Sequence, residues 1–523
     1  MVLRVRAACL RSAARFYTRR RRGESQLELP RGFDRVRTRF APSPTGELHL
    51  GGLRSALYNY LFAKSRGGDF LLRIEDTDQT RLVEGSADRV FETLDWAGLR
   101  PDEGPRVGGA SGPYVQSERA KQGFYNDVVG ELMDRGHAYR CFCSADRLEK
   151  LRLEQSQQGV ATMYDRHCAS LSKAESDARA RNEPFVVRMR VPEGEVQMQD
   201  IVSGRLHVDG RTVDDQVLMK SDGMPTYHLA CVVDDRMMEI SHVIRGAEWL
   251  PSLPKHALLY DMLEWQRPRF AHLPLLLDGE FGGKLSKRNK ASSVQWFINQ
   301  GFLSDAVLNF VAFLGWGGDV HGQRLKLPEL VEHFDLSRVG KSGAIVDLAM
   351  LRSINKAHVA EAVRSESTAL DEMCACLEKK VREEFPHAAG TESARVRRIA
   401  KLLSDRASCV EEMLGLAEHF FVEDWESAPP RDDSELLAVS TFRSLLAEQL
   451  AEDQDVDFAK LLKTTQQQTK LKGKRLMMPI RRAITGAEVG ASLSETLAIL
   501  GRDTCLRRLD SVLKDAPVVE DTA

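Results

Sequence analysis

Residues 41–54 read APSPTGELHLGGLR, and this stretch decides how the first part of the chain is expected to fold. Its two prolines interrupt a regular strand because they lack a backbone N–H group, and its glycines leave room for close approach to the backbone. The preceding run RVRTRF (35–40) favours a strand, and the following run has apolar residues at helical spacing until Gly67. An isolated turn would also contain such residues. The whole pattern, however, predicts a strand, a glycine-containing loop and a helix whose N-terminus faces an anion such as phosphate.

Composition restricts the class of protein. A chain of 523 residues has room for roughly three or four domains of about 100–200 residues each. Charged residues make up 29% of the chain and the net charge is −2, so the charge balance does not indicate a histone-like DNA binder. It does not exclude a protein that binds nucleic acid through local basic patches. Nine cysteines in this length do not indicate a disulfide scaffold, and the absence of an apolar run of 18 residues predicts no membrane span.

The N-terminal segment differs from the rest of the chain. Eight arginines precede the first acidic residue, Glu24, and several of them share a helical face beside small and apolar residues. This composition is typical of an organellar transit peptide, so we expect residues 1–30 to direct the protein to the mitochondrial matrix and then to be removed. A basic arm that binds RNA is the alternative.

Strand and helix patterns alternate after this segment. FLLRIEDTD (70–78) indicates a buried strand that ends in acids, and a helix is expected through Val90 and Trp96. Such alternation predicts a parallel sheet with crossover helices, interrupted by an insertion and then completed. The charged stretch 149–158 is helix-like. The expected domains are the first half of this sheet domain at 35–113, an insertion at 114–222, the second half of the sheet domain at 223–290, a helical region at 291–355 and a further helical region at 356–523.

The last third of the chain has helical periodicity. Its apolar residues recur every three or four positions, which predicts amphipathic helices packed around a common core. The clearest series is Val396, Ile399, Ala400, Leu403, Ala407, Val410, Leu414, Ala417 and Phe421.

A second informative stretch is FGGKLSKRNK (281–290). Two flexible glycines followed by closely spaced cations suit a mobile loop that neutralises charge on a polyphosphate leaving group. A single cluster of this kind is also typical of an exposed basic surface loop. Its position after the second half of an interrupted α/β sheet favours the first interpretation.

Several of these stretches together resemble the class I aminoacyl-tRNA synthetases. HLGG (49–52) stands where that class has its HIGH signature, and KLSKR (284–288) stands where it has KMSKS. RFAPSPTG, RIEDTD, YHLACVVDD and VIRGAEW, in this order, are similar to the glutamyl-tRNA synthetase family, and KGKRLMMPIRRAITG (472–486) resembles part of its anticodon-binding region. The resemblance implies an α/β fold: a class I Rossmann-like catalytic domain with an α+β insertion, followed by α-helical stem-contact and anticodon-binding domains.

The resemblance implies an ATP site, with Mg²⁺ accompanying the nucleotide. His49 would donate to phosphate oxygens and Gly51 would leave room for the adenosine, at a helix N-terminus that favours negative charge. The lysines of the second stretch would close over the pyrophosphate. The implied ATP-binding residues are His49, Gly51, Glu248, Lys284, Leu285, Ser286, Lys287 and Arg288, of which His49, Lys284, Ser286 and Lys287 are the implied catalytic residues.

The resemblance also implies a glutamate pocket. Glu75 matches the position that holds the α-amino group, and Arg39 and Arg245 match those that pair with the γ-carboxylate. A guanidinium fork binds a carboxylate through two hydrogen bonds, so glutamine would leave it desolvated and unpaired. The implied glutamate-binding residues are Arg39, Ala41, Ser43, Glu75, Tyr227, Cys231 and Arg245, where Cys231 stands at a position that is often asparagine in bacterial relatives.

A group of cysteines lies in the expected insertion. Cys141, Cys143, Tyr164 and Cys168 resemble the zinc-binding variant of this domain, although the histidine that follows the third cysteine in some relatives is absent. Three sulfurs and one further ligand would form a closed structural zinc site. Buried free thiols are the alternative.

The expected activity is therefore ligation of glutamate to tRNA(Glu) in mitochondrial translation, by a monomer that needs no membrane. Whether tRNA(Gln) is also charged stays open. A glutaminyl-tRNA synthetase and a non-catalytic tRNA-binding relative are the alternatives. The helical last third disfavours the former because that enzyme has a β-barrel anticodon module, and the intact His49, Glu75, Lys284 and Lys287 disfavour the latter.

Overall fold

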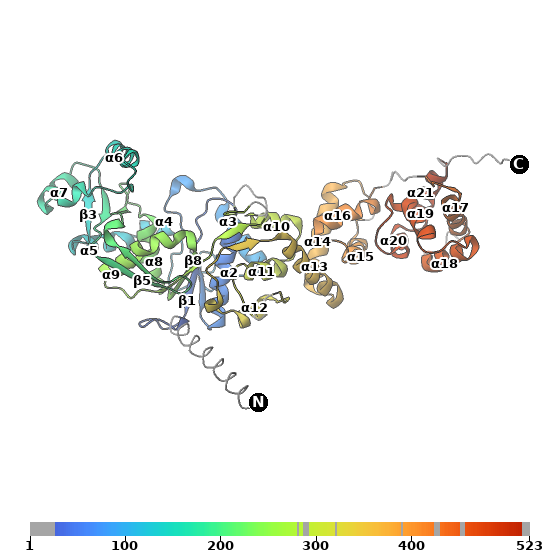
Figure 1. Cartoon of the computed structure of the whole chain (residues 1–523), viewed down its shortest axis with the longest axis horizontal. Helices are drawn as coiled ribbons and strands as arrows, with labels where there is room; N and C mark the ends of the chain where they lie inside the picture. Colours follow the sequence, from blue (N-terminus) through green and yellow to red (C-terminus); the bar gives the residue numbers. More distant parts are fainter. Residues whose placement is uncertain are drawn as a thin grey trace, which may run out of the picture. The chain divides into compact units, whose positions relative to one another are not determined.

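The chain divides into two compact units in the computed structural model (Figure 1). The first consists of Met1–Trp296 and Leu308–Asp347, and the second of Phe297–Val307 and Leu348–Ala523. The predicted roles of residues 1–26 and of Ser286, Lys287 and Arg288 lie outside the described residues. The structure describes residues 27–279, 282–285, 292–318, 322–388, 391–422, 429–449 and 456–514.

The stretch around residues 41–54 folds as predicted. Strand β1 (Arg37–Phe40) leads through a loop into helix α2 (Leu50–Ser65). His49 caps this helix, because its Nδ1 accepts a hydrogen bond from the backbone N–H of Gly51 at 3.0 Å. The chain then turns at glycines: a Cβ atom at Gly68 would lie 2.1 Å from the carbonyl oxygen of Val36, so only glycine fits there.

The strand predicted over residues 70–78 is shorter in the structure. Strand β2 (Asp69–Leu72) pairs in parallel with β1 and ends before the acids. The segment that would continue β1 contains Pro42 and Pro44, which cannot donate to a ladder. The backbone N–H of Glu75 still donates to the Pro42 carbonyl at 3.0 Å, so Glu75 is held beside the loop rather than within a strand.

The central sheet contains strands from three parts of the chain: β1 and β2, the strands β8 (His242–Gly246) and β9 (Arg269–Leu273), and the hairpin of β5 (Glu195–Asp200) and β6 (Gly204–Asp209). Strand β8 pairs in parallel with β9 and lies beside β1, where the N–H of Ser241 donates to the Arg37 carbonyl at 3.0 Å. The hairpin of β5 and β6 falls within the range predicted as insertion, yet β5 pairs with β9. This part of the insertion range therefore extends the sheet.

Helices cover both faces of the sheet. Helix α2 lies on one face, where Asn59 donates to the carbonyl of Ile244 at 2.9 Å. Helices α8 (Tyr227–Met237) and α9 (Leu253–Met262) share an apolar cluster with Val243 on the other face (Figure 1). Since side chains alternate along a strand, Arg245 points toward α8 and α9 as Val243 does.

A separate antiparallel sheet of β3 (Ala138–Cys141), β4 (Val186–Met189) and β7 (Val217–Met219) forms the rest of the insertion. The predicted helices through Trp96 and over residues 149–158 are present as α3 (Ser86–Trp96) and α6 (Ala145–Gln157). The other elements up to residue 347 are α4 (Gln116–Lys121), α5 (Phe124–Asp134), α7 (Lys173–Ala180), β10 (Leu276–Asp278), α10 (Val294–Gln300), α11 (Ser304–Ala312), α12 (Leu327–His333) and β11 (Ala344–Val346).

The second unit is helical, as the periodicity predicted. The series that begins at Val396 lies in or against one apolar cluster. Across the described ranges, no helix is long and apolar enough to cross a membrane. The helices are α13 (Leu348–Ser365), α14 (Thr368–Glu384), α15 (Ser393–Leu403), α16 (Val410–Ala417), α17 (Asp433–Ala447), α18 (Phe458–Thr469), α19 (Lys474–Thr485), α20 (Leu493–Leu500) and α21 (Arg502–Lys514).

Candidate active site

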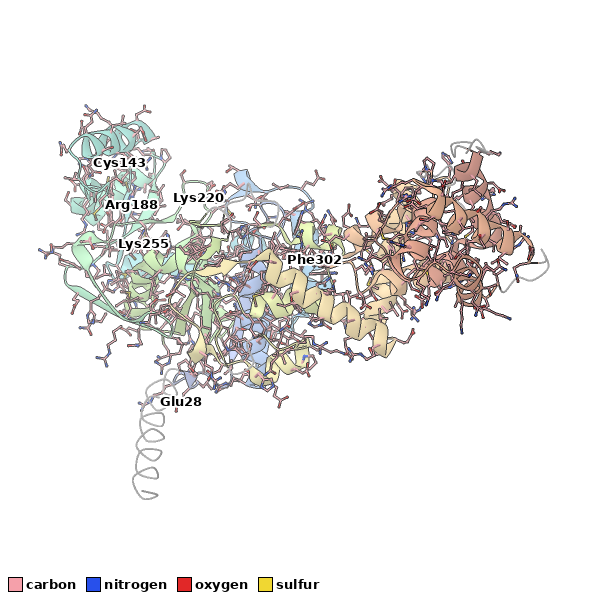
Figure 2. All side chains as sticks on the ribbon, turned by 45° about the vertical axis from the view of Figure 1, so that its right-hand side comes forward. Glu28, Cys143, Arg188, Lys220, Lys255 and Phe302 are labelled. Carbon is pink, nitrogen blue, oxygen red and sulfur yellow. The ribbon has the colours of Figure 1, made fainter. Side chains whose placement is uncertain are left out.

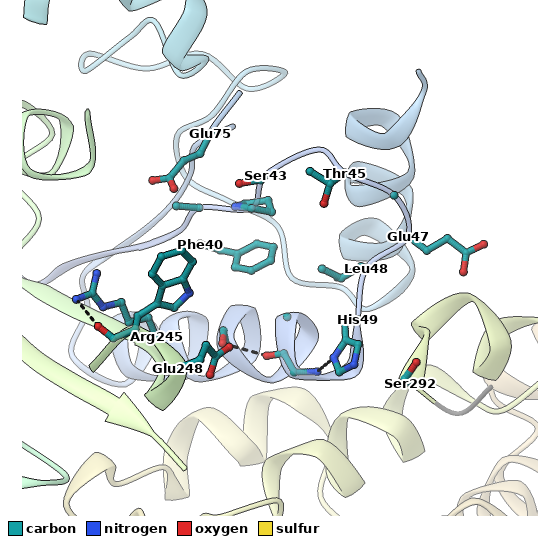
Figure 3. Close-up of a pocket in the computed structure, with 18 of the residues that line it drawn as sticks. Phe40, Ser43, Thr45, Glu47, Leu48, His49, Glu75, Arg245, Glu248 and Ser292 are labelled. Carbon is teal, nitrogen blue, oxygen red and sulfur yellow. Dashed lines mark hydrogen bonds between the residues drawn. The ribbon is translucent and has the colours of Figure 1, made fainter. Parts of the chain in front are cut away.

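A cavity of about 530 Å³ opens where β1 and β8 end and α2 begins. Its size suits small-molecule ligands, and its position at the carboxyl ends of parallel strands is the usual place for them. Figure 3 shows Glu75 and Arg245 toward one side of this cavity and His49 toward the other. The predicted residues that line it are Arg39, Ala41, Ser43, His49, Gly51, Glu75, Tyr227, Arg245 and Glu248.

The N-terminus of α2 forms the part of the cavity that suits phosphate. Because Nδ1 of His49 accepts the Gly51 N–H, a neutral imidazole carries its proton on Nε2 and can donate from that atom. The helix dipole adds partial positive charge at the same place. Ser292 and Ser293 also line the cavity, and the backbone of Ser293 forms a β-bridge with His49.

A buried ionic network lies behind the other side of the cavity. Glu75 accepts from Arg73 Nη2 at 2.9 Å, and Arg73 Nη1 donates to Asp235 at 2.8 Å. Asp235 also accepts from Nε and Nη2 of Arg39 at 2.9 and 3.2 Å, so the charge of Arg39 is already matched by a carboxylate. Burial raises the pKa of Glu75 above its ordinary value, although Arg73 and Arg39 act in the opposite direction.

Arg245 has different surroundings. Its Nη1 donates to the hydroxyl of Tyr227 at 3.0 Å, and its Nε donates to Nε2 of His272 at 3.0 Å. The Tyr227 ring packs on the indole of Trp249, with ring centroids 4.3 Å apart. Within the described part of the chain Arg245 forms no ion pair, so its charge is available to an anionic ligand in the cavity.

Some predicted residues do not line the cavity. Cys231 is buried behind Arg39, its thiol donates to Asp235 over 3.6 Å, and burial raises its pKa to about 12, so it stays a neutral thiol. Lys284 is exposed and bridges Leu277 in the backbone, and Leu285 is buried next to it. The structure therefore places Cys231 behind the cavity, and the predicted roles of Cys231 toward glutamate and of Lys284 and Leu285 toward ATP stay predictions.

The structure adds residues that the sequence analysis did not single out. Thr45 and Trp249 line the cavity, and Asp234 and Asp235 lie in the buried network. Two acids at the end of an apolar run, as in YHLACVVDD, are the pattern that could have indicated this network. Buried carboxylates are stable only with charged or hydrogen-bonding partners.

The cysteine cluster predicted in the insertion is assembled. The sulfur atoms of Cys141, Cys143 and Cys168 lie within 4.8 Å of one another. The hydroxyl of Tyr164 lies 3.3 Å from the sulfur of Cys141 and 3.4 Å from that of Cys143. Arg188 stacks on the Tyr164 ring at 4.0 Å, and Figure 2 labels Arg188 and Cys143 in this part of the molecule. The three sulfurs and one oxygen form a compact set of donor atoms.

The fold and the cavity define a class I aminoacyl-tRNA synthetase. The family described as tRNA synthetases class I (E and Q), catalytic domain, matches residues 35–353, and the family described as anticodon binding domain matches residues 368–513. Enzymes of this class use ATP with Mg²⁺.

The chain belongs to the glutamate–tRNA ligases. It is 44% identical to the glutamate–tRNA ligase of Chloroherpeton thalassium over 91% of this chain and 97% of that protein, and 39% identical to that of Finegoldia magna over 91% and 99%. The crystal structure of a glutamate tRNA ligase from Elizabethkingia meningosepticum in complex with its amino acid matches with a TM-score of 0.79 and 32% identity, over 92% of this chain and all of that one. The resemblance stated from the sequence is thus confirmed at the level of the family, and these relatives are bacterial.

Proposed function

We propose that the cavity binds glutamate and ATP side by side and joins them. Glu75 holds the α-ammonium group and Arg245 the γ-carboxylate, while His49 and Gly51 hold the phosphates at the N-terminus of α2. The observation that carries this proposal is the placement of Glu75 and Arg245 on one side of a single cavity and His49 on the other (Figure 3).

In the proposed reaction, an α-carboxylate oxygen of glutamate attacks the α-phosphorus of ATP. The bond between the α-phosphorus and the oxygen that bridges it to the β-phosphorus breaks, which gives glutamyl-adenylate and pyrophosphate. A ribose hydroxyl of the terminal tRNA adenosine then attacks the acyl carbon, AMP leaves, and the hydroxyl proton passes to solvent or to the departing phosphate. No side chain acts as a covalent nucleophile, so the residues contribute positioning and charge stabilisation.

Glu75→Gln is expected to raise KM for glutamate about 10- to 100-fold and to leave KM for ATP nearly unchanged, because one charge-assisted hydrogen bond is lost. Only the ionised carboxylate pairs with the ammonium group. Since the pKa of Glu75 is raised, KM for glutamate in the unaltered protein should rise as the pH falls toward that pKa, and the variant should lose this dependence. The control is Asp76→Asn, whose carboxylate accepts from the Ser117 backbone at 2.8 Å. Equal effects on both KM values would contradict the role of Glu75.

The proposed cofactor of the insertion is a structural Zn²⁺ ion. Three cysteine sulfurs and one further donor match the ligand set of closed zinc sites, and the spacing of the sulfur atoms suits a common ion. The ion would be held by Cys141, Cys143, Cys168 and the oxygen of Tyr164.

Purified protein is therefore expected to contain about one zinc per chain, and Cys143→Ser should lower both the zinc content and the melting temperature. Cys376→Ser, a partly buried cysteine outside the cluster, is the matched control. Metal content is measured by atomic emission after dialysis. Full-length protein that holds no zinc, with the three thiols titrating freely, would show that the cluster consists of buried thiols.

The proposed location is the mitochondrial matrix. The family match begins at residue 35, so the arginine-rich segment lies before the region shared with the family. This supports a separate role for residues 1–30, as a transit peptide.

A fluorescent reporter fused to residues 1–30 should accumulate in mitochondria, and a chain that starts near Pro30 should charge tRNA with unchanged salt dependence. An RNA-binding arm would behave differently, because each lost phosphate contact reduces the salt slope of tRNA binding by about one. A cytosolic reporter, or a flatter salt dependence in the shortened chain, would contradict the proposal.

The proposed partner is tRNA(Glu), and the protein acts as a monomer without a membrane. We keep the domain boundaries predicted from the sequence as part of this proposal, with residues 114–222 contacting the acceptor end and residues 356–523 the anticodon. The match of residues 368–513 to an anticodon binding domain supports the latter. Whether tRNA(Gln) is a second substrate depends on anticodon contacts.

A further inference from the structure

The guanidinium of Arg245 is anchored by a neutral ring rather than by a carboxylate. Its Nε donates to Nε2 of His272 at 3.0 Å, and Nδ1 of His272 lies 2.7 Å from Oδ2 of Asp200. These three side chains are buried, with exposed fractions of 6%, 1% and 0% in that order. They form a chain of hydrogen bonds that starts inside the sheet and ends at the cavity.

The sheet register accounts for this chain. Arg245 of β8 and His272 of β9 are register partners on neighbouring parallel strands, so their side chains lie on the same face. Asp200 is the last residue of β5 and pairs with Phe270 of β9. The hairpin that extends the central sheet therefore delivers the carboxylate to His272.

Both carboxylate oxygens of Asp200 accept hydrogen bonds. Its Oδ1 accepts the backbone N–H groups of Val202 and Ser203 at 3.0 and 2.7 Å. Its Oδ2 accepts the backbone N–H of His272 at 3.1 Å as well as the ring N–H. Burial alone would raise the pKa of Asp200, but these hydrogen bonds hold it below its ordinary value, so the carboxylate stays ionised.

This arrangement selects one tautomer of His272. A carboxylate only accepts hydrogen bonds, so Nδ1 carries the proton and Nε2 keeps its lone pair for the N–H of Arg245. In the other tautomer, two N–H groups would face each other between His272 and Arg245.

We propose that Asp200 and His272 are positioning residues that hold Arg245 for the side-chain carboxylate of the substrate. The inference rests on the role of Arg245 in the proposed function. A carboxylate at the place of His272 would cancel the charge of Arg245, as Asp235 matches that of Arg39. An imidazole fixes the guanidinium and leaves its charge for the ligand, and the pair thereby sets the preference for glutamate over glutamine.

The test is Asp200→Asn in the full-length protein. The backbone N–H groups of Val202 and Ser203 hold the amide oxygen, so the amide NH₂ group faces Nδ1 of His272, forces the wrong tautomer and loses the hydrogen bond from the His272 backbone N–H. In pyrophosphate exchange with tRNA present, KM for glutamate should rise about 10- to 100-fold while KM for ATP changes less than about twofold. The preference for glutamate over glutamine should fall by a similar factor.

His272→Gln and His272→Leu give a second measurement that does not depend on Asp200. The glutamine side chain offers an oxygen acceptor to Arg245 and the leucine side chain offers none, so KM for glutamate should rise less in His272→Gln than in His272→Leu. In an Arg245→Gln background, Asp200→Asn should raise KM for glutamate by less than about a further twofold, because both changes act on the same contact with the substrate. His242→Gln is the matched control, because His242 is equally buried on β8 but contacts Ser241 and Phe62.

Three results would overturn the inference. One is a KM for glutamate within twofold of the unaltered protein in both Asp200→Asn and His272→Leu while Arg245→Gln raises it strongly. Another is an equal loss for glutamate and ATP in these variants together with a loss in His242→Gln, which would indicate a general effect on the sheet. If Arg245→Gln itself leaves KM for glutamate unchanged, the role of Arg245 fails and the inference falls with it.

Discussion

Arg245→Gln is expected to lower kcat/KM for glutamate by a factor on the order of 10²–10³ while KM for ATP stays nearly unchanged. Arg245 is 6% exposed and lines the cavity, and no described carboxylate pairs with it. Removing one partner of a buried charge pair costs roughly 3–4 kcal/mol, which corresponds to this factor. Steady-state pyrophosphate exchange at varied glutamate and varied ATP measures both constants.

Two further variants make this prediction sharper. Arg245→Lys keeps the charge but loses the planar fork, so it should recover only part of the activity. Arg269→Gln replaces an arginine at the opposite end of the neighbouring strand, where it pairs in register with His242, and should leave both constants unchanged. Equal losses for glutamate and ATP in Arg245→Gln would indicate a structural role for this residue.

Lys287→Ala is expected to slow adenylate formation by a factor on the order of 10²–10³ without unfolding the protein. Lys287 lies outside the described residues, so this prediction rests on the sequence and on the described residues on either side of it in the chain. Lys284 comes before Lys287 in the chain, and Ser292 and Ser293, which follow it, line the cavity. A cation in the loop expected from the sequence would neutralise charge that develops on the phosphates as pyrophosphate leaves.

The control for this variant is Lys290→Ala, in the same loop and with no assigned role. Single-turnover measurements of adenylate formation separate the chemical step from substrate binding. Near-normal rates of adenylate formation in Lys287→Ala would contradict the assigned role. An equal loss of rate in Lys290→Ala would indicate that adenylate formation depends on the positive charge of this stretch and not on the position of Lys287.

The strand, loop and helix around residues 41–54 could be predicted because each signal is local. Proline and glycine restrict the backbone directly, and the apolar spacing of α2 matches its buried face. The helices of the second unit could be predicted for the same reason. The end of β2 could not, because it depends on the prolines of a neighbouring segment rather than on the strand's own residues.

Side-chain partnerships across the sheet also could not be predicted. Asp200 and His272 are 72 positions apart, and their contact depends on β5 joining β9 in one register. The sequence likewise assigns Arg39 and Arg245 the same role, whereas the structure gives one a buried carboxylate partner and the other a neutral imidazole. Such differences depend on long-range pairing, which no local pattern encodes.

The most direct test of the account is pyrophosphate exchange by the full-length protein with glutamate or glutamine, each with and without tRNA(Glu). We expect exchange with glutamate in the presence of tRNA and a kcat/KM for glutamine lower by a factor on the order of 10³ or more, because glutamine leaves the Arg245 guanidinium unpaired. Exchange with glutamine at a comparable rate, or no exchange with either amino acid in the presence of tRNA, would contradict it.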